Sequence, residues 1–212
     1  MSTFRLCIIS ILVVTTSFVA HSQARETPKT ESPIGAAVQQ DNFFPQVKFE
    51  TSMGDIVIEL SRAKAPVTVN NFLTYVKEEG YDNTLFHRII AGYIVQGGAY
   101  TTDFTERKSN YKIINESGNG LKNEAYSIAM ARMSDPHSAK RQFFFNMKDN
   151  DNLDPGRRWG YTVFGSVIEG KEVLDAISLV DTRVNPEIGF PDTPVENVVL
   201  KRAIIMPEPV FD

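Results

Sequence analysis

Short apolar stretches dominate this chain, and helical periodicity appears in only two places along it. The segment VKFETSMGDIVIEL at 47–60 alternates apolar and polar residues on both sides of a turn at Gly54, which predicts an antiparallel hairpin. Its second arm places Ile56, Ile58 and Leu60 on one buried face. Further stretches with the length and composition of strands occur at 85–89, 93–97, 127–131, 142–147, 161–167 and 197–205.

The two helical patterns are amphipathic and short. APVTVNNFLTYVKEEG at 65–80 has Pro66 at a helix start, Gly80 as a stop signal, and apolar residues at i, i+3, i+4 and i+7 from Val69. GKEVLDAISLV at 170–180 repeats the pattern over fewer residues. Many antiparallel strands with only two helices predict a closed barrel whose open ends the helices cover, since closure removes edge strands.

Composition and charge narrow the class of protein. The 212 residues are 42% hydrophobic and 23% charged, which is enough apolar material for one globular core. The formal net charge is −4, so the chain lacks the basic surface that neutralises phosphates. We expect neither a nucleic acid nor an anionic membrane surface as a partner.

The N-terminus has the features of an export signal. Arg5 precedes an apolar stretch at 6–20, and the small residues Ser22 and Ala24 have the spacing of a cleavage site. We therefore expect a signal peptide over 1–24 that is cleaved near Ala24. An uncleaved signal that tethers the protein to the inner membrane is the alternative, although the apolar stretch is shorter than the ~20 residues of a membrane span.

The remaining sequence divides into three parts. Residues 25–46 are rich in Pro, Gln, Ser and Thr without apolar periodicity and predict a flexible tether. One domain is expected over 47–207, followed by a tail at 208–212. The single cysteine, Cys7, lies within the predicted signal, so the mature chain has no thiol, as suits an oxidising compartment.

Several kinds of catalytic site are missing from the sequence. Beyond the signal the chain has two histidines, His87 and His137, and neither stands in a metal-ligand spacing. The acidic run DNDNLDPG at 149–156 has Leu153 where a calcium loop needs an oxygen ligand. G-x-S-x-G and P-loop motifs are also missing. We expect no metal and no cofactor.

Two segments, FHRIIAGYIVQGG at 86–98 and MARMSDPHSAKRQFFFNM at 130–147, resemble the cyclophilins, a family of peptidyl-prolyl cis/trans isomerases. The resemblance covers residues 47–205. It implies a closed eight-stranded antiparallel β-barrel capped by two α-helices. The short connection NESGNGLKNEAYSIAMAR at 115–132 is similar to the exported, periplasmic bacterial branch of the family.

The resemblance implies that Arg88 is the catalytic residue. Rotation about an X-Pro amide breaks no bond, and a guanidinium aimed at the proline nitrogen would favour the twisted amide over both planar forms. Without the surrounding motif, a strand-surface arginine paired with a nearby carboxylate would be the favoured interpretation of Arg88. His87 alternates to the opposite face of the strand and is expected to be structural.

The substrate-binding residues are carried over from the family position by position. Their expected roles are a proline pocket, hydrogen bonds to the peptide backbone, and an edge beside the extended substrate. The matching residues are Tyr93, Ile94, Gln96, Ala131, Arg132, Gln142, Phe144, Leu153 and Tyr161.

Departures from the family pattern affect inhibitor binding and specificity. Asn152 stands where many eukaryotic members have a tryptophan that contacts cyclosporin, and Tyr161 replaces a pocket histidine. Weak cyclosporin binding is therefore expected. Ala91 replaces the usual proline in the turn after Ile90, and Arg141 replaces a small residue before Gln142, which predicts added bulk and charge near the groove.

The expected partners are proline-containing peptides and unfolded or folding client proteins, bound by a monomer. Two functions remain open: an exported isomerase that assists folding, and a proline-peptide-binding module or holdase chaperone whose turnover is incidental. Arg88 favours the isomerase, since binding alone needs no charge at the amide nitrogen. A barrel that encloses a small ligand is disfavoured because the inward positions are filled by Phe, Ile, Val and Leu.

Overall fold

The computed structural model describes residues 34–208 of the chain. In this range no helix is both long enough and apolar enough to span a membrane. The predicted signal peptide, the tether up to residue 33 and the tail beyond residue 208 lie outside the described residues.

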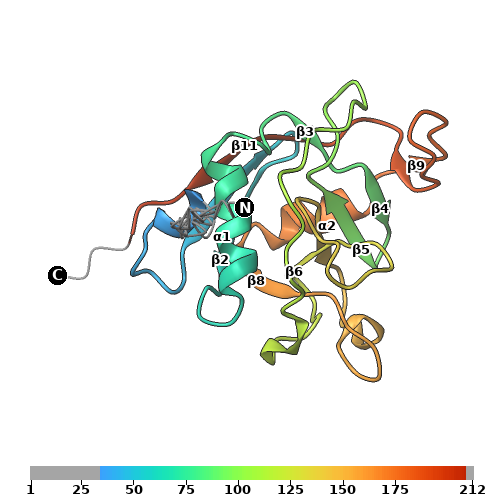
Figure 1. Ribbon diagram of the computed structural model, residues 1–212. Helices are drawn as coiled ribbons and strands as arrows, with labels where there is room; N and C mark the ends of the chain where they lie inside the picture. The colour runs from blue at the N-terminus through green and yellow to red at the C-terminus, as the bar shows by residue number, and fades with distance from the viewer. Residues whose placement is uncertain (1–33, 209–212) are drawn as a thin grey trace, which may run out of the picture. The chain divides into compact units, whose positions relative to one another are not determined.

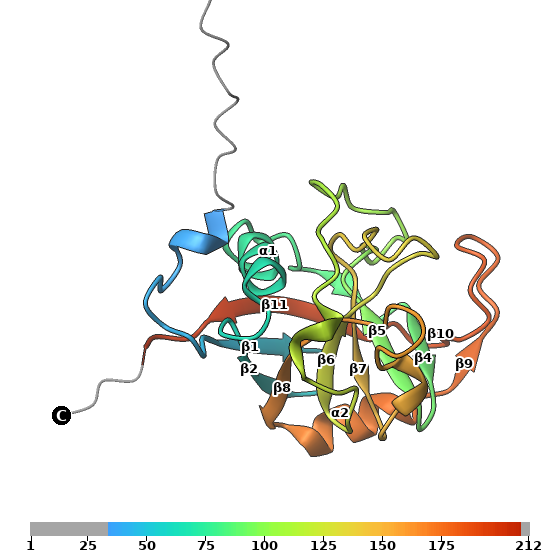
Figure 2. The same ribbon diagram turned by 60° about the horizontal axis from the view of Figure 1, so that its bottom comes forward.

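Nine strands form one curled antiparallel sheet (Figures 1 and 2). They are β1 Gln46–Thr51, β2 Asp55–Leu60, β3 Thr84–Leu85, β4 Arg88–Ile90, β5 Ile94–Gly97, β6 Ser127–Met130, β7 Phe143–Asn146, β8 Val163–Glu169 and β11 Val199–Ile205. Their order across the sheet is β3-β11-β1-β2-β8-β6-β7-β5-β4. Every stretch predicted as a strand contains one, and 85–89 contains parts of two.

The predicted closed barrel of eight strands is corrected in two respects: the sheet has nine strands, and its edge strands β3 and β4 do not pair with each other. The segment 84–90 divides at Phe86 and His87, so that Leu85 pairs with Val199 of β11 while Arg88 pairs with Gln96 of β5. One stretch of chain therefore serves both edges of the sheet. The two edges of the curled sheet are therefore joined by Phe86 and His87 of the chain, and not by hydrogen bonds between β3 and β4.

The first hairpin follows the predicted alternation. Phe49 of β1 pairs with Ile56 of β2, and Gly54 in the turn has φ +135°, which favours glycine. Ile56, Ile58 and Leu60 are fully buried, as predicted. This hairpin supplies one side of the core.

Two α-helices, α1 Pro66–Lys77 and α2 Lys171–Ser178, lie on opposite sides of the curled sheet (Figure 2). Pro66 occupies the first turn of α1, as expected. The carboxylate of Glu116 accepts hydrogen bonds from the backbone N–H groups of Val67 (3.2 Å) and Thr68 (2.8 Å) and so caps this helix from a distant segment. Three short 3₁₀ helices complete the helical elements: η1 Ile34–Ala37, η2 Ser117–Asn119 and η3 Asp151–Leu153.

Aromatic rings fill the interior between α1 and the sheet. The ring centroid of Phe72 lies 5.2 Å from that of Phe164, and Phe143 lies 5.4 Å from both Phe49 and Tyr81. All five side chains are fully buried. The interior therefore packs as a solid core, as expected from the inward residues.

The predicted tether over 25–46 is corrected for more than half of its length, because residues 34–45 are folded onto α1 and β2. Arg62, at the end of β2, is 7% exposed and donates hydrogen bonds to backbone carbonyls of this segment, including Val38 O and Asn42 O at 2.8 Å. The Gly35 N–H also donates to Thr74 Oγ1 of α1 at 2.9 Å. The bonds to Val38 O and Asn42 O satisfy the buried guanidinium of Arg62.

A small second sheet pairs β9 Thr182–Arg183 with β10 Thr193–Pro194. Its strands are too short for an alternating pattern, and the sequence did not predict them. The loop 184–192 between them extends beside β4 (Figure 1).

Candidate active site

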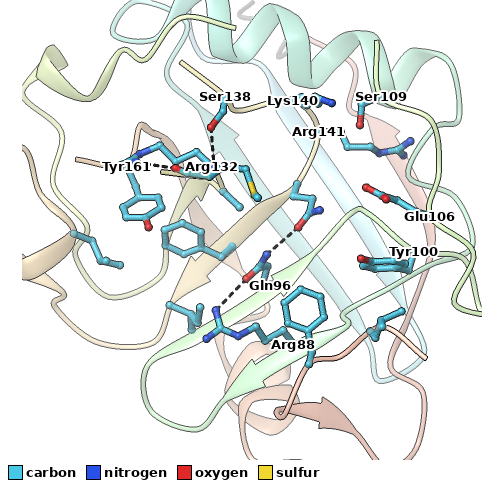
Figure 3. Close-up of a pocket in the computed structure, with 18 of the residues that line it drawn as sticks. Arg88, Gln96, Tyr100, Glu106, Ser109, Arg132, Ser138, Lys140, Arg141 and Tyr161 are labelled. Carbon is cyan, nitrogen blue, oxygen red and sulfur yellow. Dashed lines mark hydrogen bonds between the residues drawn. The ribbon is translucent and has the colours of Figure 1, made fainter. Parts of the chain in front are cut away.

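One cavity of about 750 Å³ opens beside β4, β5 and β7 (Figure 3). All ten residues predicted for the site line it: Arg88, Tyr93, Ile94, Gln96, Ala131, Arg132, Gln142, Phe144, Leu153 and Tyr161. The structure thus brings together residues up to 73 positions apart, while their individual roles stay predictions. Apolar and polar groups occupy separate parts of the wall.

The apolar part of the cavity is built on β5, β7, η3 and the residues just before β8. Phe144 is 3% exposed and packs with Ile94 in one buried cluster, against which Leu153 and Tyr161 also pack. The ring of Tyr161 meets that of Phe144 edge-on, with centroids 5.5 Å apart. Asn152 Nδ2 donates to the Tyr93 hydroxyl at 3.1 Å and orients it at the rim.

The polar part is a row of three side chains that the strand register places on one face. Arg88 lies directly opposite Gln96 across β4 and β5, so both side chains project into the cavity. Gln96 Nε2 donates to Gln142 Oε1 at 2.9 Å, and Arg88 Nη1 donates to Gln96 Oε1 at 3.5 Å (Figure 3). The row fixes which way each glutamine amide points.

Arg88 also has the carboxylate partner that the alternative interpretation required. Its Nε lies 3.5 Å from Asp192 Oδ2, and both side chains are 31% exposed. The guanidinium nevertheless remains part of the cavity wall. Arg88 therefore forms an ion pair with Asp192 and still borders the cavity.

Ala131 and Arg132 form the edge opposite Arg88. The Ala131 N–H already donates to Gln142 O at 2.9 Å, so it is occupied within the protein. The Arg132 side chain donates to Gly160 O (3.2 Å) and its Cζ lies 4.5 Å from the centroid of the Tyr161 ring. The Arg132 side chain thus packs over the Tyr161 ring at this edge.

Arg141 lines the cavity, as its expected place near the groove implies, but its side chain is almost fully buried. It is 3% exposed, and its guanidinium donates to Gly98 O (2.7 Å), Lys108 O (2.8 Å) and Gly80 O. Its Cζ also lies 5.0 Å from the centroid of the Tyr75 ring. Burial lowers the pKa of this guanidinium. Arg141 therefore joins three backbone segments at the wall of the cavity.

His87 is fully buried on the face opposite Arg88, as the alternation predicts. Its ring centroid lies 4.9 Å from that of Tyr100 and 5.5 Å from that of Phe190. Burial lowers the pKa of His87 from 6.5 to about 4. The imidazole is therefore neutral at pH 7 and fills space beside the site.

Further cavity residues were missed by sequence reasoning: Tyr100, Glu106, Ser109, Met133, Ser138, Lys140, Ile188 and Phe190. Met133, Ser138 and Lys140 fall inside the quoted family segment, so their neighbourhood was available as a signal. The others lie in loops at 100–109 and 184–192, which carry no periodicity. No group of three or more potential metal ligands occurs among residues 34–208.

Fold and site together define a curled antiparallel sheet with an apolar pocket that has a cation and two amides at its edge. The chain belongs to the cyclophilin family: the family model described as cyclophilin type peptidyl-prolyl cis-trans isomerase matches residues 46–204. It is a cyclophilin-type peptidyl-prolyl cis-trans isomerase.

Relatives with that activity in their names cover most of the chain. Peptidyl-prolyl cis-trans isomerase cyp18 of Streptomyces antibioticus is 48% identical over 76% of this chain and 98% of its own length. Peptidyl-prolyl cis-trans isomerase B of Escherichia coli is 42% identical over 75% of this chain and 98% of its own. A cyclophilin-type isomerase of Cryptosporidium parvum matches in structure with a TM-score of 0.65 and 25% identity, covering 79% of this chain and 100% of that one.

Proposed function

We propose that this isomerase accelerates X-Pro isomerisation in exported proteins as they fold, with Arg88 stabilising the twisted amide. The X-Pro amide has a rotation barrier of ~18–20 kcal/mol, and uncatalysed exchange takes tens of seconds or longer. No covalent bond changes during the reaction. The enzyme therefore has only to bind the twisted amide more tightly than either planar form.

The observation that carries this proposal is that a guanidinium and an aromatic floor border the same cavity. A proline ring packed on Phe144 would lie in the cavity that Arg88 borders. As the amide twists, its nitrogen loses conjugation and becomes a better hydrogen-bond acceptor, so a fixed cation favours the twisted state. A Cryptosporidium parvum relative was crystallised in the presence of the dipeptide Ala-Pro, which supports proline peptides as ligands of this fold.

The test is a protease-coupled assay on an Ala-Pro-Phe reporter peptide. We expect Arg88→Ala to lower kcat/KM at least tenfold, the equivalent of about 1.4 kcal/mol of transition-state stabilisation. Its melting temperature should stay close to that of the unchanged protein, because Arg88 is a third exposed. A folded Arg88→Ala protein with full activity would refute the catalytic role.

Export is proposed from the sequence of residues 1–24 and from the position of the single cysteine within them. Expression of the full chain in a Gram-negative bacterium, osmotic-shock fractionation and N-terminal sequencing would test it. The expected product is a periplasmic protein that begins near Arg25. Recovery in the membrane fraction with Met1 retained would instead support the uncleaved tether.

A holdase function is the second candidate, and one observation favours it. Met133 borders the cavity with 75% of its surface exposed, which suits the retention of unfolded apolar segments. Arg88→Ala separates the two functions. If suppression of client aggregation survives in that variant while assisted refolding is lost, turnover is the activity that matters for folding.

A further inference from the structure

The loop 184–192 between β9 and β10 brings a second set of side chains to the site. Ile188 and Phe190 line the cavity, and the carboxylate of Asp192 lies 3.5 Å from Arg88 Nε. None of these residues belongs to the segments on which the resemblance rests. The loop therefore adds side chains to the cavity from outside those two segments, although it lies within the residues that the family model matches.

A buried asparagine holds the loop in shape. Asn185 is 4% exposed, its N–H donates to Phe190 O at 2.9 Å, and its carbonyl accepts from Gly189 N at 2.9 Å. Its side-chain Oδ1 accepts from Glu187 N at 2.8 Å. These bonds close the loop into a compact turn that does not depend on a substrate.

Two contacts fix the end of the loop against the sheet. The Ile89 N–H of β4 donates to Asp192 O at 2.8 Å, so the backbone of Asp192 continues the sheet beside Arg88. The Phe190 ring packs edge-on against His87, the residue before β4, with centroids 5.5 Å apart. The end of the loop is thus held by a hydrogen bond to β4 and by a ring contact just before that strand.

We propose that Asp192 is a positioning residue that orients the Arg88 guanidinium for the reaction. A guanidinium is planar, so partners on two different nitrogens define its plane. Asp192 Oδ2 lies beside Nε and Gln96 Oε1 accepts from Nη1, each at 3.5 Å, which leaves Nη2 for the substrate. Arg88 projects toward Gln96 in Figure 3. This inference rests on the catalytic role proposed for Arg88.

The first test compares three variants by NMR exchange spectroscopy on a proline peptide. Asp192→Ala should lower kcat about fivefold with KM within twofold, the equivalent of about 1 kcal/mol and the upper end for a pair exposed to this degree. Asp192→Asn keeps an acceptor oxygen and should retain at least half of the activity. Glu187→Gln removes a carboxylate from the same loop, without an ion pair to Arg88, and should behave as the unchanged enzyme.

The second test asks whether Asp192 acts through Arg88. In an Arg88→Ala background, Asp192→Ala should cause no further loss, because the group that it positions is gone. Full kcat in Asp192→Ala, equal losses in the Ala and Asn variants, or an unchanged fivefold loss in the Arg88→Ala background would each overturn the proposal. An active Arg88→Ala enzyme would instead remove the catalytic assignment of Arg88 itself.

Discussion

Arg62, Arg88 and Arg141 have the same side chain but differ in burial and in hydrogen-bond partners, and therefore differ in role. Arg62 and Arg141 are almost fully buried, and backbone carbonyls accept their hydrogen bonds. Burial lowers the pKa of both. Arg88 is a third exposed, and its two side-chain partners both lie at 3.5 Å. Only Arg88 therefore has a guanidinium that can exchange protein partners for a substrate.

Asn152 should determine how weakly this enzyme binds cyclosporin. An indole at this exposed position would add a large apolar face and an N–H donor that the amide lacks. Losing such a contact costs on the order of 2–4 kcal/mol, or roughly thirty- to a thousandfold in Kd. We expect weak inhibition of the unchanged enzyme and tighter inhibition of Asn152→Trp, with little change in kcat/KM, because Arg88 and Phe144 are untouched.

Titration of enzyme activity with the drug would measure both affinities. Asn152 also donates to the Tyr93 hydroxyl, so Asn152→Ala serves as a control that removes this bond without adding the indole. Tight inhibition of the unchanged enzyme, or equal affinities of the Trp and Ala variants, would contradict the interpretation.

His87 should make the stability of the protein depend on pH. Its pKa of about 4 in the folded protein lies below the value of about 6.5 expected when unfolded, so only the unfolded chain takes up a proton between these values. The free energy of unfolding should therefore fall as pH drops from 6.5 to 4, by about 3 kcal/mol in total.

His87→Phe keeps an aromatic ring beside Tyr100 and removes the titrating group. Denaturant unfolding at several pH values should give a smaller pH slope for this variant in the same window. Carboxylates titrate in both proteins, so the difference between the two curves isolates His87. Parallel curves would show that the imidazole ionises in the folded protein as readily as in the unfolded one.

At the scale of elements, the segment 34–45 is part of the domain. Arg62→Met keeps an apolar stem but leaves the carbonyls of this segment without their donor, which should cost about 3 kcal/mol of folding free energy. Hydrogen exchange should speed up at Val38 and Asn42, whose backbone N–H groups have bonds within the segment.

Lys64→Met, two residues away and exposed, is the matched control and should leave exchange in this segment unchanged. Isomerase activity should persist in both variants, because the segment contributes no residue to the cavity. Unchanged protection in Arg62→Met would mean that other contacts hold the segment.

Elements with strong periodicity were predictable, and elements defined by tertiary contacts were not. Alternation located β1 and β2, and apolar stretches at 93–97 and 161–167 located β5 and β8. The division of 84–90 into β3 and β4 was not predicted. The chain changes its pairing partner after Phe86, from β11 to β5, and this change depends on tertiary contacts. The loop 184–192 has no apolar period, and its shape depends on a buried asparagine.

At the scale of the whole molecule, the candidate site was predictable. The resemblance to the cyclophilins supplied its residues, and the register of the paired strands brings those residues together. Arg88, Gln96 and Phe144 lie on three adjacent strands with projections fixed by pairing. Asp192 could not be predicted in this way, because only the return of the chain after α2 places it beside β4. The role of Arg141 also required the structure, since three distant carbonyls satisfy it.

Because the sheet divides at Phe86 and His87, activity at the site should depend on whether the C-terminal strand of the domain is in place. Leu85, on one side of this seam, is bonded to the last strand of the domain, and Arg88, on the other, carries the proposed chemistry. Only two residues separate Leu85 from Arg88. Detachment of the last strand should therefore also disturb His87, the residue before Arg88. A partly unfolded form that has lost its C-terminal strand should therefore be inactive, even with every other site residue in place.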